Sequence, residues 1–239
     1  MRARLCGLIA GYVTIAPASA LAAAWIPDRP ELILSSDQGV RGRFYNTANS
    51  LYFDAPISRS FSVVGSGRYE ISPARPSSVR DVGEAQLTVK AGRQFGAGIV
   101  GAVQVGPTWR NDLDPDCSGF GGEARALLGA SRGKAFFDVQ VGARVQSRDC
   151  ARAFYQASLG YRPAKNWLGL AQVFVDDDLQ KGSNTKGQFS LVRTNKKGVG
   201  LQIGARLGIG GEAERTLVIG TWRKLGRAKR QTGAPQIGS

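Results

Sequence analysis

Residues 199–209 read Val-Gly-Leu-Gln-Ile-Gly-Ala-Arg-Leu-Gly-Ile, and this stretch decides the fold. Every second residue, from Val199 to Ile209, is apolar, whereas the residues between them are glycine, glutamine or arginine. Successive side chains of a β-strand point to opposite faces, so a strand puts all the apolar residues on one face. A helix would not sort them in this way. The stretch therefore predicts a strand with one apolar and one polar face.

The same alternation recurs along the chain. It is clear at residues 61–70, 84–92, 123–130, 136–146 and 153–162. It is weaker at residues 31–45, 48–55, 95–106, 167–177, 187–194 and 214–224. Together these segments predict about twelve strands.

The connections between these segments are of two kinds, which alternate along the chain. The short ones lie at residues 56–59, 92–94, 131–134, 163–166 and 195–198. The others are mostly longer and more polar, at residues 73–82, 107–119, 147–151 and 178–186, with shorter members near 46–48 and 210–213. Transmembrane barrels have short periplasmic turns and longer outer loops. The pattern predicts an all-β, antiparallel, up-and-down transmembrane barrel in the outer membrane.

The N-terminus has the features of a secretory signal peptide. Arg2 and Arg4 precede an apolar run at residues 5–16, and small residues at 18–24 offer cleavage sites. We expect a signal peptide over residues 1–24 with the mature start near Trp25. The barrel is then expected over residues 25–224, followed by a basic periplasmic tail over 225–239.

The composition excludes several classes of function. The 239 residues include no His, which removes the Ser-His-Asp and Cys-His arrangements and the commonest metal ligand. The net charge of +14 would suggest nucleic acid in a cytosolic protein, but the export signal argues against that partner. We expect no enzymatic activity, no cofactor, no metal and no nucleic acid.

A soluble barrel that binds a ligand inside would alternate in the same way, with its apolar face turned inward. The polar set here is rich in glycine, glutamine and serine, which suits a hydrated lumen. Aromatic residues gather toward strand ends, as in the interfacial girdles of membrane barrels, at Tyr155, Tyr161, Trp167, Phe189 and Trp222. These features favour the membrane barrel and leave the periplasmic ligand binder as an alternative.

Several strand motifs also carry a family resemblance. They lie at residues 122–129, 136–142, 159–163 and 167–172 and at the closing Trp222-Arg223. The chain resembles a group of small alphaproteobacterial outer-membrane β-barrels of uncharacterised function, whose mature chains often start Ala-Trp, as at residues 24–25. The resemblance implies the fold and no catalytic residues. The expected partners are outer-membrane lipid, lipopolysaccharide and the barrel-assembly machinery.

The polar faces supply the candidate lumen. The charged side chains expected there are Arg68, Glu70, Glu84, Lys90, Glu123, Arg125, Asp138, Arg144, Arg162 and Arg206. Cations outnumber acids in this set, which predicts a passive pore that favours small anions. Bulky residues on the same face leave a structural or plugged barrel without transport as the alternative, notably Phe136, Phe154, Leu168 and Leu170.

Two cysteines are expected to form a disulfide. A hairpin that turns at residues 131–134 places opposite each other residues whose numbers add to about 265. The numbers of Cys117 and Cys150 add to 267, and both lie just beyond the same end of that hairpin. Exported proteins favour disulfides, so the register predicts a bond between them.

Overall fold

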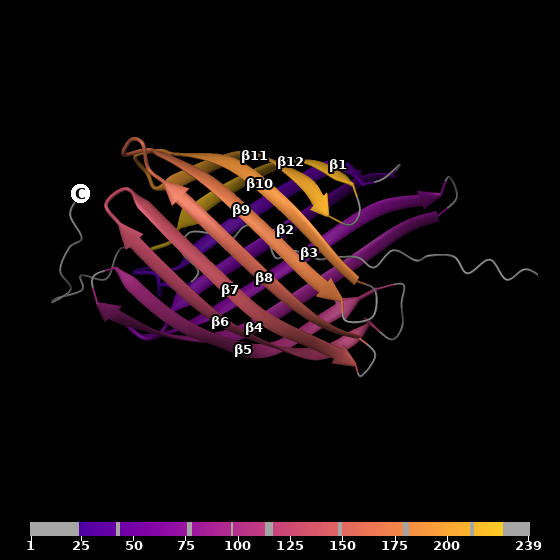
Figure 1. Ribbon diagram of the computed structural model, residues 1–239, viewed down its shortest axis with the longest axis horizontal. Helices are drawn as coiled ribbons and strands as arrows, with labels where there is room; N and C mark the ends of the chain where they lie inside the picture. The colour runs from indigo at the N-terminus through magenta and orange to yellow at the C-terminus, as the bar shows by residue number, and fades with distance from the viewer. Residues whose placement is uncertain are drawn as a thin grey trace, which may run out of the picture.

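The computed structural model describes residues 24–41, 44–75, 78–96, 98–112, 117–147, 150–178, 182–210 and 213–226. Twelve antiparallel strands form one closed barrel, in which each strand pairs with the next and β1 pairs with β12 (Figure 1). The strands are β1 (Glu31–Arg41), β2 (Phe44–Pro56), β3 (Phe61–Arg75), β4 (Ser78–Gly96), β5 (Ile99–Asn111), β6 (Gly119–Arg132), β7 (Ala135–Ser147), β8 (Cys150–Tyr161), β9 (Trp167–Asp178), β10 (Gly182–Thr194), β11 (Val199–Gly210) and β12 (Glu214–Lys224). The fold class predicted from the alternation is therefore confirmed.

The strands are longer than the sequence pattern suggested. Much of the stretch expected to be a polar loop at residues 73–82 is strand, because β3 runs to Arg75 and β4 begins at Ser78. Likewise β5 continues to Asn111 and β10 begins at Gly182. A strand ladder is held by backbone hydrogen bonds and needs no apolar face. At the start of β10, for example, residues 183–186 are all polar, so both faces are polar and the alternation that marks a strand disappears there.

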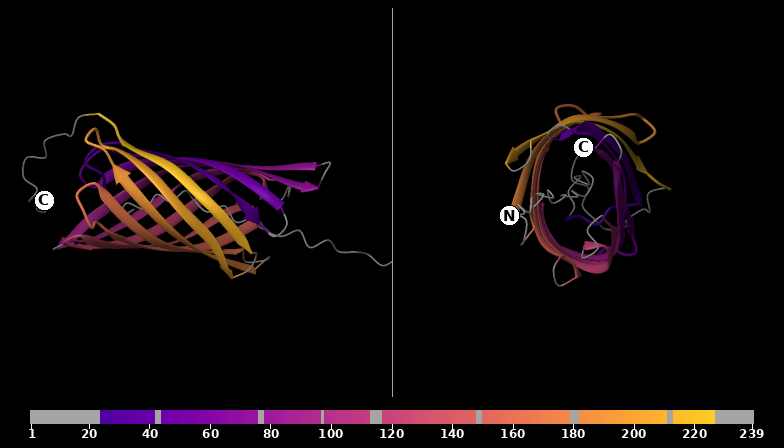
Figure 2. Two further views of the ribbon diagram at one scale, coloured as in Figure 1. Left: turned by 90° about the horizontal axis from the view of Figure 1, so that it is seen from above. Right: turned by 90° about the vertical axis from the view of Figure 1, so that its right-hand side faces the viewer.

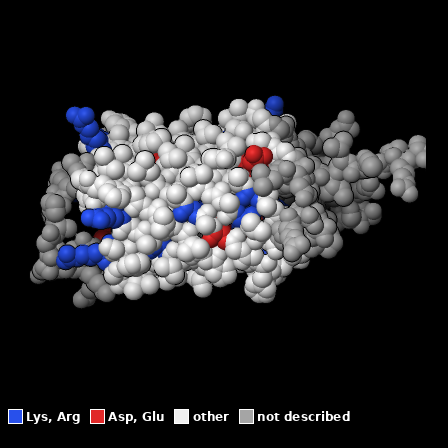
Figure 3. Space-filling model, turned by 60° about the horizontal axis from the view of Figure 1, so that its bottom comes forward, with Lys and Arg blue, Asp and Glu red and all other residues white. Residues whose placement is uncertain are grey.

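The apolar face of the sheet points outward. Leu201, Ile203 and Leu207 on β11 are half or more exposed, whereas Gln202 and Arg206 between them are 1 % exposed. The wall in Figure 3 is mostly free of charge. An apolar exterior around a polar interior is the arrangement of a transmembrane barrel, and it is the reverse of a soluble ligand-binding barrel. No helix among the described residues is long and apolar enough to cross a membrane.

The interior has layers along the barrel axis, and the barrel is oval in cross-section (Figure 2). Near the short turns an apolar layer lines the lumen, formed by Ile33, Tyr52, Val64, Phe136, Leu168, Leu170, Val192 and Trp222. A second apolar cluster on the β5–β6 side comprises Val100, Ala102, Leu127 and Ala24, with Trp25 packed against it. Charged and amide side chains occupy the rest of the lumen. The candidate site is therefore a polar interior with an apolar layer at its short-turn end.

The connections at residues 57–60, 97–98, 133–134, 162–166 and 195–198 lie at one end of the barrel, called here the short-turn end. The expected difference in length from the other end is wrong except at residues 112–118, because the strands extend into the segments expected to be long loops. Between β6 and β7 the chain reverses through Gly133 and Lys134, and Arg132 pairs with Ala135. Gly133 has a φ of 59°, in the left-handed region that glycine adopts without strain. Both the start of β1 and the end of β12 lie at this same short-turn end.

Candidate functional site: the barrel lumen

Nine of the ten charged residues expected in the lumen have side chains on its wall. They are Arg68, Glu70, Glu84, Lys90, Glu123, Arg125, Asp138, Arg144 and Arg206. Arg162 differs, because β8 ends at Tyr161 and Arg162 is exposed in the turn that follows. Pro163 comes next, and a proline cannot donate a ladder hydrogen bond. The Arg162 guanidinium lies 5.8 Å from the centre of the Phe136 ring.

The structure adds eight charged residues to the lumen. The acids are Asp37, Asp54, Asp112, Asp176 and Glu214, and the bases are Arg110, Arg152 and Lys186. With them, the described lumen wall carries eight basic and nine acidic side chains. The expected surplus of inward cations is therefore wrong. The missing residues lie on strands with weak alternation or at strand ends that were expected to be loops.

One charged cluster joins β11, β1 and β3. Asp37 Oδ2 accepts hydrogen bonds from Arg206 Nη1 at 2.9 Å and from Arg68 Nη1 at 3.1 Å. Arg68 also donates from Nη2 to Glu70 Oε2 at 3.1 Å. Arg206 Nε donates to Gln188 Oε1 at 2.8 Å. Each contact to Asp37 passes over an intervening strand, so the cluster ties together non-neighbouring parts of the wall.

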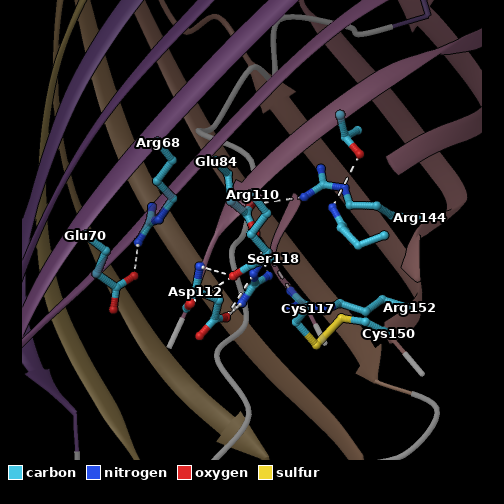
Figure 4. A network of polar contacts seen from close by, with 12 residues as sticks. Arg68, Glu70, Glu84, Arg110, Asp112, Cys117, Ser118, Arg144, Cys150 and Arg152 are labelled. Atoms are coloured by element: carbon cyan, nitrogen blue, oxygen red, sulfur yellow. Dashed lines mark hydrogen bonds and ion pairs between the residues drawn. A yellow bond between two sulfur atoms is a disulfide. The ribbon is translucent and has the colours of Figure 1, made fainter. Parts of the chain in front are cut away.

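A second cluster is centred on Glu84 of β4 (Figure 4). Arg110 Nη1 on β5 and Arg144 Nη1 on β7 donate to its two carboxylate oxygens at 2.5 and 3.0 Å. Arg152 Nη1 on β8 lies 3.9 Å from Glu84 Oε1. Arg144 also donates to Glu123, at 2.6 Å from Nη2 to Oε2. Glu84 thus connects strands that are up to four positions apart around the barrel.

The segment before β1 packs inside the short-turn half of the lumen. The Trp25 carbonyl accepts a hydrogen bond from Lys90 Nζ at 2.9 Å, and the Ala24 amide donates to Asp138 Oδ2 at 3.1 Å. The Trp25 ring lies on Gly129, where any Cβ would be 1.9 Å from the ring. Only glycine allows this approach. No periodic pattern predicts these contacts, since they join residues more than 60 positions apart.

The predicted disulfide between Cys117 and Cys150 is present, with Cα atoms 5.2 Å apart. The β6–β7 ladder pairs Arg132 with Ala135 and Gly122 with Val145, so its residue numbers add to 267, as those of the cysteines do. The bond lies beside the Glu84 cluster, at the end of the barrel away from the short turns (Figure 4). It joins the start of β8, which carries Arg152, to the residues that precede β6.

The lumen also carries polar atoms suited to water or solute. Among the described residues, several buried side-chain atoms have no hydrogen-bond partner in the protein, including Asn46 Oδ1, Ser62 Oγ, Gln104 Nε2, Asp176 Oδ1 and Asn184 Oδ1. Buried polar atoms of this kind are usually satisfied by water. No group of three or more acidic, cysteine or histidine side chains in the described ranges could hold a metal ion. The arrangement therefore offers hydration and charge pairing.

Comparisons with known proteins identify the fold. No family model and no curated protein sequence matches the chain. Among solved structures, a NanC porin is similar with a TM-score of 0.61 and 10% identity, over 81% of this chain and 100% of that one. An outer membrane channel from Pseudomonas putida F1 gives a TM-score of 0.60 and 13% identity, over 90% of this chain and 100% of the other. Outer membrane phospholipase A from Escherichia coli gives 0.50 and 16% identity, over 82% and 93% of the two chains.

Proposed function

We propose that this chain is an outer-membrane barrel through which small solutes diffuse passively. The observation that carries the proposal is the placement of seventeen charged side chains inside a closed barrel whose outer wall is apolar. A wall of charged and amide groups lowers the free energy of water and polar solutes in the lumen. The likeness to a porin and to an outer membrane channel supports the same function.

We expect weak charge selectivity. The anion preference that the sequence suggested depended on a surplus of inward cations, and the described lumen has no such surplus, with eight basic and nine acidic side chains. Four arginines do face the lumen from the consecutive strands β5 to β8, namely Arg110, Arg125, Arg144 and Arg152. Glu84 and Glu123 pair with these arginines, which offsets their charge. Any preference for anions should therefore be small.

Cysteine labelling in planar bilayers tests the pore directly. Gln104 faces the lumen and is 5 % exposed, whereas its neighbour Val103 faces outward and is 59 % exposed. We expect steady conductance steps that a charged, thiol-reactive methanethiosulfonate reduces in the Gln104→Cys variant. The matched Val103→Cys variant should keep its conductance. The native cysteines of the barrel are held in the disulfide and do not react. If the correctly folded protein produced no conductance steps, the result would contradict the proposed pore.

A structural barrel without transport is the second candidate. The apolar layer formed by Ile33, Tyr52, Val64, Phe136, Leu168, Leu170, Val192 and Trp222 favours it. A hydrophobic constriction can close a channel by excluding water. In that case the folded protein would show no conductance in planar bilayers. Substitution of Leu168 and Leu170 by serine would then open the constriction and produce conductance steps.

We also propose that the chain is not an enzyme. The likeness to a phospholipase shows that a barrel of this kind can carry catalysis, but this sequence has no His to activate a serine. Its partners are proposed to be outer-membrane lipid, lipopolysaccharide at the end opposite the short turns, and the barrel-assembly machinery during insertion. The short-turn end, where β1 begins and β12 ends, is proposed to face the periplasm.

A further inference from the structure

A groove of about 540 Å³ crosses the outer wall over β9. Its floor is formed by small residues, Gly169 and Ala171, on that strand. Its sides are larger apolar residues of the neighbouring strands, Leu159, Tyr161, Phe189 and Leu191. In the ladder Gly169 lies between Tyr161 and Leu191, and Ala171 lies between Leu159 and Phe189. The groove is therefore a depression in the outer wall, lined mostly by residues that face the hydrocarbon of the membrane.

Basic residues gather where this groove reaches the short-turn end. The next outward pair along β9 and β10 is Trp167 with Arg193, and the Arg193 guanidinium lies 5.4 Å from the centre of the Trp167 ring. Two residues of a strand span about 7 Å, so Arg193 lies just beyond the end of the groove. Exposed basic residues in the two flanking turns surround it, namely Arg162, Lys165, Lys196 and Lys197.

No acid offsets these charges. Residues 162–175 and 187–211 contain no Asp or Glu, and Arg193 makes no ion pair with any described acidic side chain. Further exposed basic residues continue this basic rim around the same end of the barrel, at Arg93, Arg132, Lys134 and Arg223. Lys224 also lies there, but it is paired with Asp28 and Glu31. Figure 3 shows basic side chains projecting at this end. Because the described lumen has no surplus of basic side chains, much of the chain's positive charge lies on this rim.

We propose that the groove binds one anionic phospholipid, with its phosphate at Arg193 and an acyl chain over Gly169 and Ala171. The proposal rests on the proposed membrane placement, in which the short turns face the periplasm and meet the phospholipid leaflet. An arginine binds phosphate with two parallel hydrogen bonds, and basic residues at a membrane surface attract anionic headgroups. Trp167 lies at the same level, where indole rings favour the interface.

Native mass spectrometry of the folded chain in a neutral detergent tests the charge requirement. The probes are phosphatidylglycerol and phosphatidylcholine with identical acyl chains. We expect one phosphatidylglycerol to remain bound under collision energies that remove phosphatidylcholine. The Lys165→Ala/Arg193→Ala variant should retain roughly 25-fold less phosphatidylglycerol, because each basic residue near the surface contributes about fivefold to its binding. The matched Arg93→Ala/Arg132→Ala variant removes the same charge from the rim beside another part of the wall and should retain the lipid.

A second pair of variants tests the groove. A Cβ at Gly169 would meet nothing nearer than 3.9 Å, so Gly169→Leu fills the groove without a backbone clash. It should abolish retention, whereas Gly122→Leu, at an outward glycine with equally open space, should not. Glycerol phosphate should fail to displace the lipid, which separates a phospholipid site from a simple phosphate site.

Equal retention of the two lipids, or equal retention in all variants, would overturn the proposal. Heat-dependent gel mobility of each variant shows separately whether the barrel has folded. Conductance reports separately on the pore, so a failure of the lipid site can be told from a failure of the proposed function.

Discussion

Cys117 and Cys150 hold together two strands that are not neighbours. Cys150 is the first residue of β8, and Cys117 precedes β6, so the bond passes over the end of β7. Arg152, which approaches Glu84 across the lumen, follows Cys150 by two residues on the same face. The disulfide therefore fixes the end of the barrel where the charged cluster around Glu84 is assembled.

Removing this disulfide should destabilise the barrel. The bond closes a loop of 33 residues in sequence separation, for which the loop-entropy model gives about 3–4 kcal/mol. We expect Cys117→Ser/Cys150→Ser to unfold at a lower denaturant concentration than the oxidised protein, and reduction of the native protein to have the same effect. Alkylation of both cysteines in the unreduced protein, detected by mass spectrometry, would contradict the bond.

An arginine on the outer wall should destabilise the barrel more, the closer it lies to the bilayer midplane. Arginine in place of Ile203, an exposed residue in the middle of β11, should cost about 2–4 kcal/mol of folding free energy if it lies near the bilayer midplane. The matched Ile209→Arg variant, near the end of the same strand, should cost about 0–1 kcal/mol. Equilibrium unfolding from lipid vesicles measures both. An equal loss of folding free energy in the two variants would argue against lipid contact at Ile203.

Asp37 should control both stability and selectivity. Its carboxylate pairs with Arg68 and Arg206, so Asp37→Asn leaves two buried guanidinium groups short of a charge partner. Breaking a buried pair costs about 3–5 kcal/mol, and the added positive charge should shift reversal potentials toward anions. Asp81→Asn is the control, because Asp81 accepts a hydrogen bond from the exposed Tyr69 hydroxyl on the outer wall. An equal shift of the reversal potential in both variants would contradict a role for the lumen charge in selectivity.

The segment before β1 should restrict the lumen. Trp25 packs against the apolar cluster that includes Leu127 and lies directly on Gly129. Trp25→Ala should raise single-channel conductance, because it removes a large ring from the short-turn half of the barrel. Substitution of Trp109, an exposed tryptophan of the outer wall, is the matched control and should not change conductance. An unchanged conductance in Trp25→Ala would show that the ring does not limit flow.

The sequence predicts this fold well where two environments meet. Strands such as β11 have lipid on one side and lumen on the other, and that contrast produces the alternation from Val199 to Ile209. The disulfide followed from hairpin register alone. The charge balance could not be predicted in this way, because Asp37 lies on a weakly patterned strand and its partners Arg68 and Arg206 lie on strands that are not its neighbours. The packing of Trp25 on Gly129 has no periodic signal at all.

The extension of β3 and β4 gives the molecule a projecting ribbon. The ladder from β2 to β3 ends at Ile71 and that from β5 to β4 ends at Gly83, whereas β3 and β4 remain paired as far as Arg75 and Ser78. Beyond the wall these two strands have only each other, as Figure 1 shows at the right-hand end. Each therefore has a free edge of backbone groups. Under the proposed orientation, with the short turns in the periplasm, this ribbon projects from the outer face of the membrane with backbone groups that another strand could pair with.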